Sequence, residues 1–186
     1  EIFVAFGRLG LSLFACEAAN VVPDILTLSK ALTGGTVPLA ATIARRHVFD
    51  AFLSDDSEAA LMHGPTYMGN AIACAAANAS LDLFESEPRV LQARSIERTL
   101  KEEFAEARTF PGVVDVRCRG ALGVIEIDAT KPLAGLAQRF ADAGVFVRPF
   151  RNIVYLTPPL TIEPDELKRL AQTTRETLRG WLTQRA

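Results

Sequence analysis

The sequence predicts a chain of the α/β class in two parts, and two changes in residue pattern support this prediction. Residues 1–87 combine short apolar strands with a long run of small residues that favours a closely packed helix. After Pro111-Gly112 the apolar residues recur with a period near two, which is typical of strands. We therefore expect the last part of an α/β domain over residues 1–87 and a compact αββαββα domain over residues 88–186.

In the first part, turn residues separate the expected elements. A β-prone run opens the chain, and a glycine-containing turn at residues 7–10 follows it. Pro23 precedes an apolar strand that leads into Lys30, and a glycine pair separates this strand from the next. The elements expected here are strands at 1–6, 25–29 and 39–43, a short helix at 45–53 and a long helix at 69–85.

The second part is expected to begin and end with a helix. Pro88 suits a first helical turn, because the N–H that proline lacks has no partner there. The apolar stripe of this helix consists of Ala93, Ile96, Leu100, Phe104 and Ala107. Strands are expected at 113–119, 122–127, 145–147 and 153–156, with a helix at 132–143. Pro164 begins a last amphipathic helix whose apolar face carries Leu167, Leu170, Ala171, Thr174 and Leu178.

The composition excludes several classes of protein. The chain has 186 residues, 49% of them hydrophobic and 23% charged, with a net charge of −2, so it can bury a core and does not resemble a disordered segment. Basic residues are spread among acidic ones, and no apolar run approaches the roughly 18–20 residues of a membrane span. We therefore expect neither a nucleic-acid nor a membrane partner. Three widely spaced cysteines without a CxxC pair favour a reducing, cytoplasmic location and no metal site.

The motifs of several common enzyme classes are absent. The sequence contains no GxGxxG, GxxxxGK[ST] or GxSxG motif and no paired-histidine metal signature. Hydride transfer, nucleotide hydrolysis and serine hydrolysis therefore have no support. The chain begins at Glu1 without a targeting pattern, which is typical of the interior of a longer protein.

Lys30 is the most informative single residue. It ends an apolar strand and precedes Ala-Leu-Thr-Gly-Gly, where we expect a partly buried amine. Burial disfavours the ammonium form, and a neutral amine can attack a carbonyl or form an imine with an aldehyde cofactor. Taken alone, the position also suits a lysine that merely extends from a strand end into solvent.

A second candidate is the segment Met62-His-Gly-Pro-Thr-Tyr-Met-Gly-Asn70 before the helix of small residues. The Thr66 hydroxyl and the neighbouring backbone N–H groups could hold a phosphate. The same residues could equally form a plain loop and helix cap. His63 has no partner at metal or triad spacing and is expected to be structural.

A third candidate is Arg148, within Val147-Arg-Pro-Phe150 at the end of an expected apolar strand. A guanidinium binds a carboxylate through two parallel hydrogen bonds, so Arg148 suits an acidic substrate. A salt bridge with a neighbouring acid is the alternative. Tyr155 follows in Tyr155-Leu-Thr-Pro-Pro159.

Together these motifs resemble the C-terminal part of a class III, fold-type I aminotransferase that uses pyridoxal 5'-phosphate. The resemblance rests on Phe6-Gly-Arg-Leu-Gly10, Ser29-Lys-Ala-Leu-Thr-Gly-Gly35, the 62–80 segment and the Arg148 motif. It implies the last part of a large cofactor domain over 1–87 and a complete α+β small domain over 88–186. Within the class, Met62 to Asn70 and Ala73-Cys-Ala-Ala-Ala-Asn-Ala-Ser80 are closest to the members that aminate 8-amino-7-oxononanoate with S-adenosylmethionine in biotin synthesis.

The resemblance also implies a role for each matching residue. Lys30 would hold pyridoxal phosphate and move the proton during the reaction. Pro65 and Thr66 would bind the cofactor phosphate from the neighbouring subunit, so a homodimer would share the active site. Gly64 would line the substrate pocket, Arg148 would bind the carboxylate of the oxononanoate acceptor, and Tyr155 would lie beside it.

Some features of the family are missing, and alternatives follow from this. The aspartate that pairs with the cofactor's pyridine nitrogen, the glycine-rich phosphate loop and the stacking aromatic precede the stretch that starts at Glu1. Asn70 is followed by alanine where proline is common. The alternatives are another class III ω-aminotransferase, with ornithine, 4-aminobutyrate or lysine as substrate, and a non-catalytic truncated fragment.

Overall fold

The computed structural model describes residues 1–64, 66–128 and 133–184. Its contacts divide the chain into two compact units, which are described separately. Unit 1 comprises Glu1–Gly7 and Ser12–Pro88, and unit 2 comprises Arg8–Leu11 and Arg89–Ala186. The division after Pro88 lies beside the boundary that the sequence predicts at residue 87. The assignment of the two parts to the large and small domains of an aminotransferase stays a prediction.

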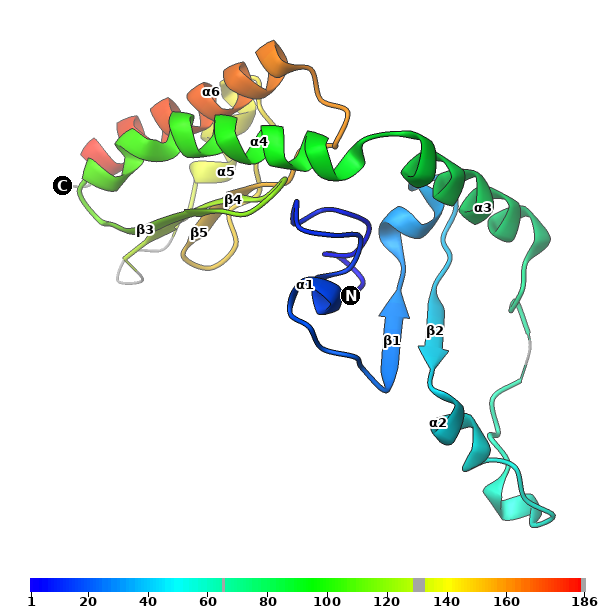
Figure 1. Cartoon of the computed structure of the whole chain (residues 1–186). Helices are drawn as coiled ribbons and strands as arrows, with labels where there is room; N and C mark the ends of the chain where they lie inside the picture. Colours follow the sequence, from blue (N-terminus) through cyan, green and yellow to red (C-terminus); the bar gives the residue numbers. More distant parts are fainter. Residues whose placement is uncertain (65, 129–132, 185–186) are drawn as a thin grey trace. The chain divides into compact units, whose positions relative to one another are not determined.

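Unit 1 is built on a two-stranded antiparallel sheet and one long helix. Strand β1 (Ile25–Leu28) pairs with β2 (Ala41–Ala44), with Leu26 opposite Ile43. The long helix is α3 (Ala71–Ser86). Unit 1 also contains the short helices α1 (Ala15–Ala18) and α2 (Arg46–Asp50), with 3₁₀ helices at Lys30–Thr33, after β1, and at Ser57–Ala59 (Figure 1). The strand at 25–29 and the helices at 45–53 and 69–85 therefore form close to their predicted places.

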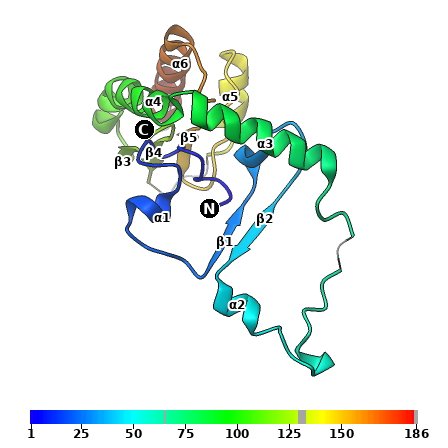
Figure 2. The same ribbon diagram turned by 45° about the vertical axis from the view of Figure 1, so that its right-hand side comes forward.

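The small residues of α3 bring this helix close to the turn that follows β1. Ala73, Ala77 and Ser80 are its buried residues, and the Ser80 hydroxyl donates a hydrogen bond to the Ala31 carbonyl at 3.0 Å. Figure 2 shows α3 passing the end of β1 where the 3₁₀ helix begins. The core of unit 1 consists of Ala5, Phe6, Leu28, Leu32 and Ala77. The turn that carries Lys30 therefore rests on a packed helix.

The predicted strand at residues 1–6 is wrong, because this segment forms consecutive turns. Phe6 and Gly7 have φ values of 58° and 76°, in the left-handed region that an extended strand does not use. The Phe6 ring packs instead against Phe14 and Phe84, with centroids 5.6 and 5.4 Å away. Burial of this aromatic side chain, which sequence alternation alone did not reveal, explains the turn.

Unit 2 is a three-stranded antiparallel sheet covered by helices. The strand order is β3 (Val113–Cys118), β4 (Gly123–Ile127) and β5 (Ile153–Leu156). Helix α4 (Arg89–Phe104) packs across β3 and β4 and runs beside α6 (Pro164–Thr183), which also contacts α5 (Leu136–Asp142) (Figure 1). The core includes all five residues of the apolar stripe predicted for α4, together with Leu167, Ala171 and Leu178 of α6.

The predicted strand at 145–147 is wrong, so the order of elements is αββαβα and not αββαββα. Phe146 is 88% exposed, and Pro149 lacks the N–H that a ladder position requires. Among the residues that the structure describes, pairing near this segment is limited to one bridge between Phe150 and Ile153. Arg148 consequently lies in an irregular segment and not at a strand end. The helix predicted at 132–143 begins later, at Leu136.

None of the described helices combines the length and apolar composition that a membrane crossing requires.

Candidate active site

The backbone turns sharply after β1 and places Lys30 at the first position of the 3₁₀ helix. The Ser29 hydroxyl donates a hydrogen bond to the Leu39 carbonyl at 2.7 Å, which ties the end of β1 to the chain that returns toward β2. Lys30 itself has a φ of 47°, in the left-handed region that non-glycine residues rarely adopt. Leu32 and Thr33, which follow it, are buried. A strained backbone of this kind persists where packing enforces it and is frequent at functional sites.

The Lys30 side chain is exposed, whereas the sequence predicted partial burial. Its Nζ lies 4.6 Å from the centroid of the Phe3 ring, a cation–π contact. Over the described ranges, no carboxylate pairs with this amine. The contact with Phe3 could not be predicted from the sequence, because it depends on residues 1–6 forming turns and not the expected strand.

Lys30 borders an open cavity of about 250 Å³ together with Ser29, Thr33, Thr36 and Leu39. The two threonine hydroxyls are engaged locally, Thr33 with the Val37 carbonyl at 2.6 Å and Thr36 with the Thr33 carbonyl at 2.8 Å. A primary amine without an acidic partner, beside a cavity, suits the aldehyde of pyridoxal phosphate. Among the described residues that line this cavity, Lys30 is the only cation, so they fit the aldehyde end of the cofactor and not its phosphate.

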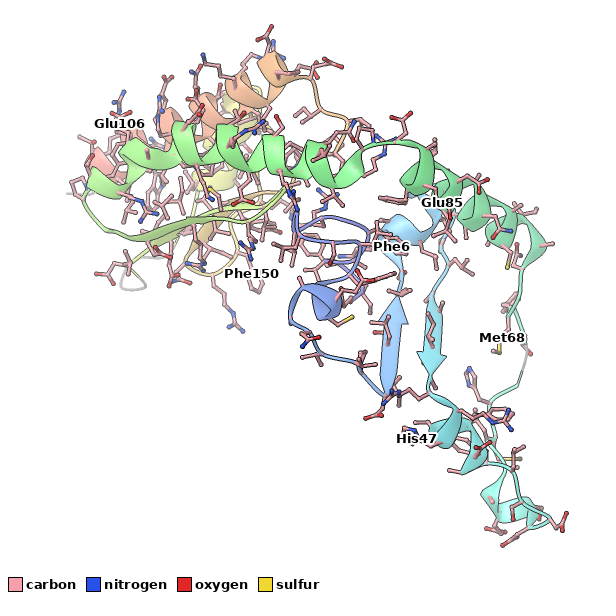
Figure 3. All side chains as sticks on the ribbon, in the orientation of Figure 1. Phe6, His47, Met68, Glu85, Glu106 and Phe150 are labelled. Carbon is pink, nitrogen blue, oxygen red and sulfur yellow. The ribbon has the colours of Figure 1, made fainter. Side chains whose placement is uncertain are left out.

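The segment that leads to α3 holds the predicted phosphate and substrate residues. Gly64 and Thr66 are exposed, and Pro65 lies outside the described residues. Asn70 caps α3, because its Oδ1 accepts a hydrogen bond from the Ala73 N–H at 3.0 Å. The predicted alternative of a helix cap at this segment is therefore present. Figure 3 labels Met68, which lies shortly before the start of α3.

Arg148 and Tyr155 line one cavity of about 330 Å³ in unit 2, and their predicted role in substrate binding stays a prediction. Phe146, Leu156 and Leu170 give the cavity apolar walls, with Thr157, Pro158 and Pro159 at the edge. Figure 3 labels Phe150, two positions after Arg148 in the chain. Within the described part of the chain, no acidic side chain pairs with Arg148, so the predicted alternative of a salt bridge is not what the structure has. An exposed guanidinium beside apolar walls can bind a carboxylate that carries a hydrocarbon chain.

Arg8 supports the edge of this cavity and was not singled out from the sequence. Its Nη1 donates a hydrogen bond to the Pro158 carbonyl at 2.5 Å. Burial lowers the pKa of the Arg8 guanidinium. The signal available in the sequence was the motif Phe6-Gly-Arg-Leu-Gly10, but nothing in that motif points to a residue 150 positions away.

The candidate residues are distributed over both units. Arg148 and Tyr155 share a cavity in unit 2, Lys30 borders a cavity in unit 1, and Gly64 and Thr66 lie on an exposed segment of unit 1. Cys16, Cys74 and Cys118 are free thiols. The described residues hold no group of three or more His, Cys, Asp or Glu side chains that could bind a metal ion.

Comparison with known protein families identifies the family to which this chain belongs. The model of the class-III aminotransferases matches residues 1–178. Among curated relatives, the adenosylmethionine-8-amino-7-oxononanoate aminotransferase of Buchnera aphidicola is 44% identical over 170 residues, which are 91% of this chain and 39% of the relative. This chain therefore spans about two fifths of the length of the curated relatives that it matches.

Solved structures agree with this family. The adenosylmethionine-8-amino-7-oxononanoate aminotransferase of Methanocaldococcus jannaschii superposes with a TM-score of 0.85 at 33% identity, over 97% of this chain and 44% of that one. An amine transaminase from an uncultivated Pseudomonas species, solved in its PLP-bound form, gives a TM-score of 0.84 at 34% identity, over 98% of this chain and 44% of that one. The predicted mixed helix-and-sheet fold is confirmed.

Proposed function

Because this chain belongs to the class-III aminotransferases, we propose that it is the C-terminal part of an enzyme that transfers the amino group of S-adenosylmethionine to 8-amino-7-oxononanoate. The product would be 7,8-diaminononanoate, an intermediate of biotin synthesis. The observation that carries the proposal is the pair Arg148 and Tyr155 at a cavity with apolar walls. Such a cavity suits an acceptor that combines a terminal carboxylate with a hydrocarbon chain. The 44% identity to a relative named for these two substrates supports the same choice.

Pyridoxal phosphate is the cofactor that we propose for Lys30. When bound, it would act as an electron sink that makes removal of a proton from the substrate carbon feasible. The Lys30 amine would hold the cofactor by its aldehyde. Once free, the same Nζ would accept the proton from the carbon that carries the amino group and donate it to the carbon of the former aldehyde, so that the amino group leaves the donor. The strained turn at Lys30 would keep the amine at a fixed position for both tasks.

The other proposed site residues bind and orient. The Arg148 guanidinium would hold the acceptor's carboxylate, and the half-buried Tyr155 ring would lie along the acceptor's chain. Gly64 would leave room for substrate, since no atom lies within 4 Å of the position where a Cβ would be. Pro65 and Thr66 would bind the cofactor phosphate.

A homodimer with a shared active site is part of the proposal. Met62 and Tyr67, on either side of Gly64 and Thr66, are 92% and 93% exposed. Large apolar side chains that are exposed together are typical of an interaction surface. A second copy of the enzyme, covering this segment, would receive Pro65 and Thr66 at its cofactor. We place the enzyme in the cytoplasm as part of the same proposal.

An assay of the full-length enzyme tests the proposed reaction. The enzyme is supplied with S-adenosylmethionine and 8-amino-7-oxononanoate, and we expect 7,8-diaminononanoate to form. Failure to form this product would exclude the proposed substrates. A parallel screen with lysine, ornithine and 4-aminobutyrate as donors distinguishes the alternative class III activities.

A non-catalytic fragment is the second alternative, and it predicts different behaviour. Such a protein would bind no pyridoxal phosphate and show no visible absorbance from it at any concentration. The described cavity at Lys30 favours the catalytic proposal, because a primary amine without an acidic partner lies at its edge.

A further inference from the structure

A short strap of the chain, Arg8–Leu11, packs within unit 2 although the residues before and after it belong to unit 1. The Ala121 N–H donates a hydrogen bond to the Arg8 carbonyl at 2.9 Å. Gly120, with a φ of 54°, leaves no room for a side chain, because a Cβ there would overlap the backbone of Arg8 and Leu9 and lie 2.7 Å from the Gly10 nitrogen. The strap and the turn between β3 and β4 are therefore in direct backbone contact.

Two charged residues of α4 hold this contact. Arg94 donates from Nε to the Gly10 carbonyl at 2.6 Å and from Nη2 to the Leu11 carbonyl at 3.3 Å. Glu97 accepts a hydrogen bond from the Gly120 N–H at 2.6 Å. Residues three apart on a helix lie on the same face, so one face of α4 binds both the strap and the turn between β3 and β4.

The strap reaches the substrate cavity through its first residue. The Arg8 side chain is half-buried, and its Nη1 donates to the Pro158 carbonyl at 2.5 Å. Pro158 and its neighbours Thr157 and Pro159 line the cavity that holds Arg148 and Tyr155. A displacement of the strap would therefore move the hydrogen-bond donor that fixes this wall.

We propose that Arg94 is a positioning residue for acceptor binding: it holds the strap so that Arg8 fixes the Pro158 carbonyl and the cavity keeps its shape for a carboxylate with a hydrocarbon chain. This inference rests on the proposed carboxylate role of Arg148. Arg94 contacts neither the cavity nor its occupant, since it is not among the residues that line the cavity. Its effect passes through two backbone carbonyls and the Arg8 guanidinium.

The test measures binding of nonanoate, a simple hydrocarbon carboxylate, to the protein by titration calorimetry. Arg94→Met keeps most of the side-chain stem and removes the donors, so it should weaken binding by about 2- to 30-fold. Arg94→Lys restores a cationic donor and should recover part of the affinity. Arg98→Met is the matched control, because Arg98 lies one turn further along α4 and bonds only the Ser95 hydroxyl at 3.4 Å among the contacts described.

The outcomes separate this inference from the proposed function. If the unsubstituted protein fails to bind nonanoate, or if Arg148→Ala binds it equally well, the carboxylate site itself is wrong and the inference fails with it. If Arg148→Ala loses binding while a folded Arg94→Met retains full affinity, only the positioning role is wrong. In the full-length enzyme, Arg94→Met should raise KM for the oxononanoate and leave the donor's KM unchanged.

A measurement without substitution covers the case in which Arg94→Met does not fold. Coupling between two sites is reciprocal, so a ligand that prefers the ordered cavity must also stabilise the strap. Saturating nonanoate should therefore slow hydrogen exchange of the Ala121 amide, whose partner is the Arg8 carbonyl. An unchanged exchange rate at saturation would overturn the inference.

Discussion

Two arginines of unit 2 show how much the surroundings decide a residue's role. The Arg175 side chain is 16% exposed and contacts Glu103 at 3.4 Å and Glu106 at 3.3 Å, so its charge is matched within the fold. Arg148 is exposed at a cavity, and no acidic partner is found for it in the ranges that the structure describes. A carboxylate ligand would give Arg148 the pairing that Arg175 already has.

Replacing Arg148 should affect the acceptor and not the donor. Hydrogen bonds to charged groups contribute about 1.5–3 kcal/mol, so Arg148→Ala in the full-length enzyme should raise KM for 8-amino-7-oxononanoate by about 10- to 150-fold. Steady-state kinetics of both half-reactions measure this. Arg151→Ala serves as the control, since Arg151 stacks on Phe150 at 5.4 Å and does not line the cavity. Equal losses for donor and acceptor would contradict the assignment.

Glu97 should make the stability of unit 2 depend on pH in the acid range. Burial by itself raises the pKa of this carboxyl, but hydrogen bonds from Lys101 and the Gly120 N–H outweigh burial and leave the pKa below the ordinary value of 4.5. Because the pKa of Glu97 is lower in the folded than in the unfolded protein, its ionised form stabilises the fold at pH values above the unfolded-state pKa. This stabilisation is lost as the pH falls through the folded-state pKa. Glu97→Gln should therefore lower stability at pH 7 by on the order of 1 kcal/mol and flatten the acid limb of the unfolding curve. Urea unfolding at several pH values measures this. An equally steep loss of the free energy of unfolding at acid pH in Glu97→Gln and in the unsubstituted protein would count against this role of Glu97.

At the scale of elements, apolar periodicity predicted the long helices correctly. It failed for segments whose conformation depends on contacts with residues far away in the sequence. Helix α4 forms where its apolar stripe indicates, and α6 begins at Pro164 as expected. Residues 1–6 form turns because the Phe6 ring packs against the rings of Phe14 and of Phe84, and Phe84 lies on α3. Residues 145–147 have an apolar pattern, but β5 and not this segment pairs with β4. Such partners are not visible in a local window of sequence.

Two glycines of unit 2 should respond in opposite directions to the same substitution. A Cβ at Gly123 would lie 3.0 Å from Phe104 and 3.2 Å from Leu100, both fully buried on α4, so Gly123→Ala should destabilise by about 1–3 kcal/mol. Gly180 lies inside α6 with nothing within 4 Å of its Cβ position, so Gly180→Ala should stabilise by about 0.5–1 kcal/mol. Thermal and urea unfolding of both variants measure the difference. A destabilised Gly180→Ala variant, or a neutral Gly123→Ala variant, would contradict this account of the packing.

At the scale of the whole molecule, the site could be predicted only where its residues are close in sequence. Arg148 and Tyr155 lie seven positions apart and share a cavity. The support that Arg8 gives to Pro158, and Arg94 to Gly10, spans 150 and 84 positions, and no local pattern signals such pairs. This chain covers about two fifths of the length of its relatives, and the cofactor site at Lys30 stays a proposal.

The most direct test of the account is to identify the amine that holds pyridoxal phosphate. The full-length enzyme is loaded with the cofactor, the linkage is reduced with borohydride, and peptides are mapped by mass spectrometry. We predict that the cofactor is attached to the peptide that carries Lys30, and that Lys30→Ala abolishes the attachment while Lys168→Ala, on the exposed face of α6, leaves it intact. Attachment to another lysine, or an unchanged attachment in Lys30→Ala, would contradict the central claim.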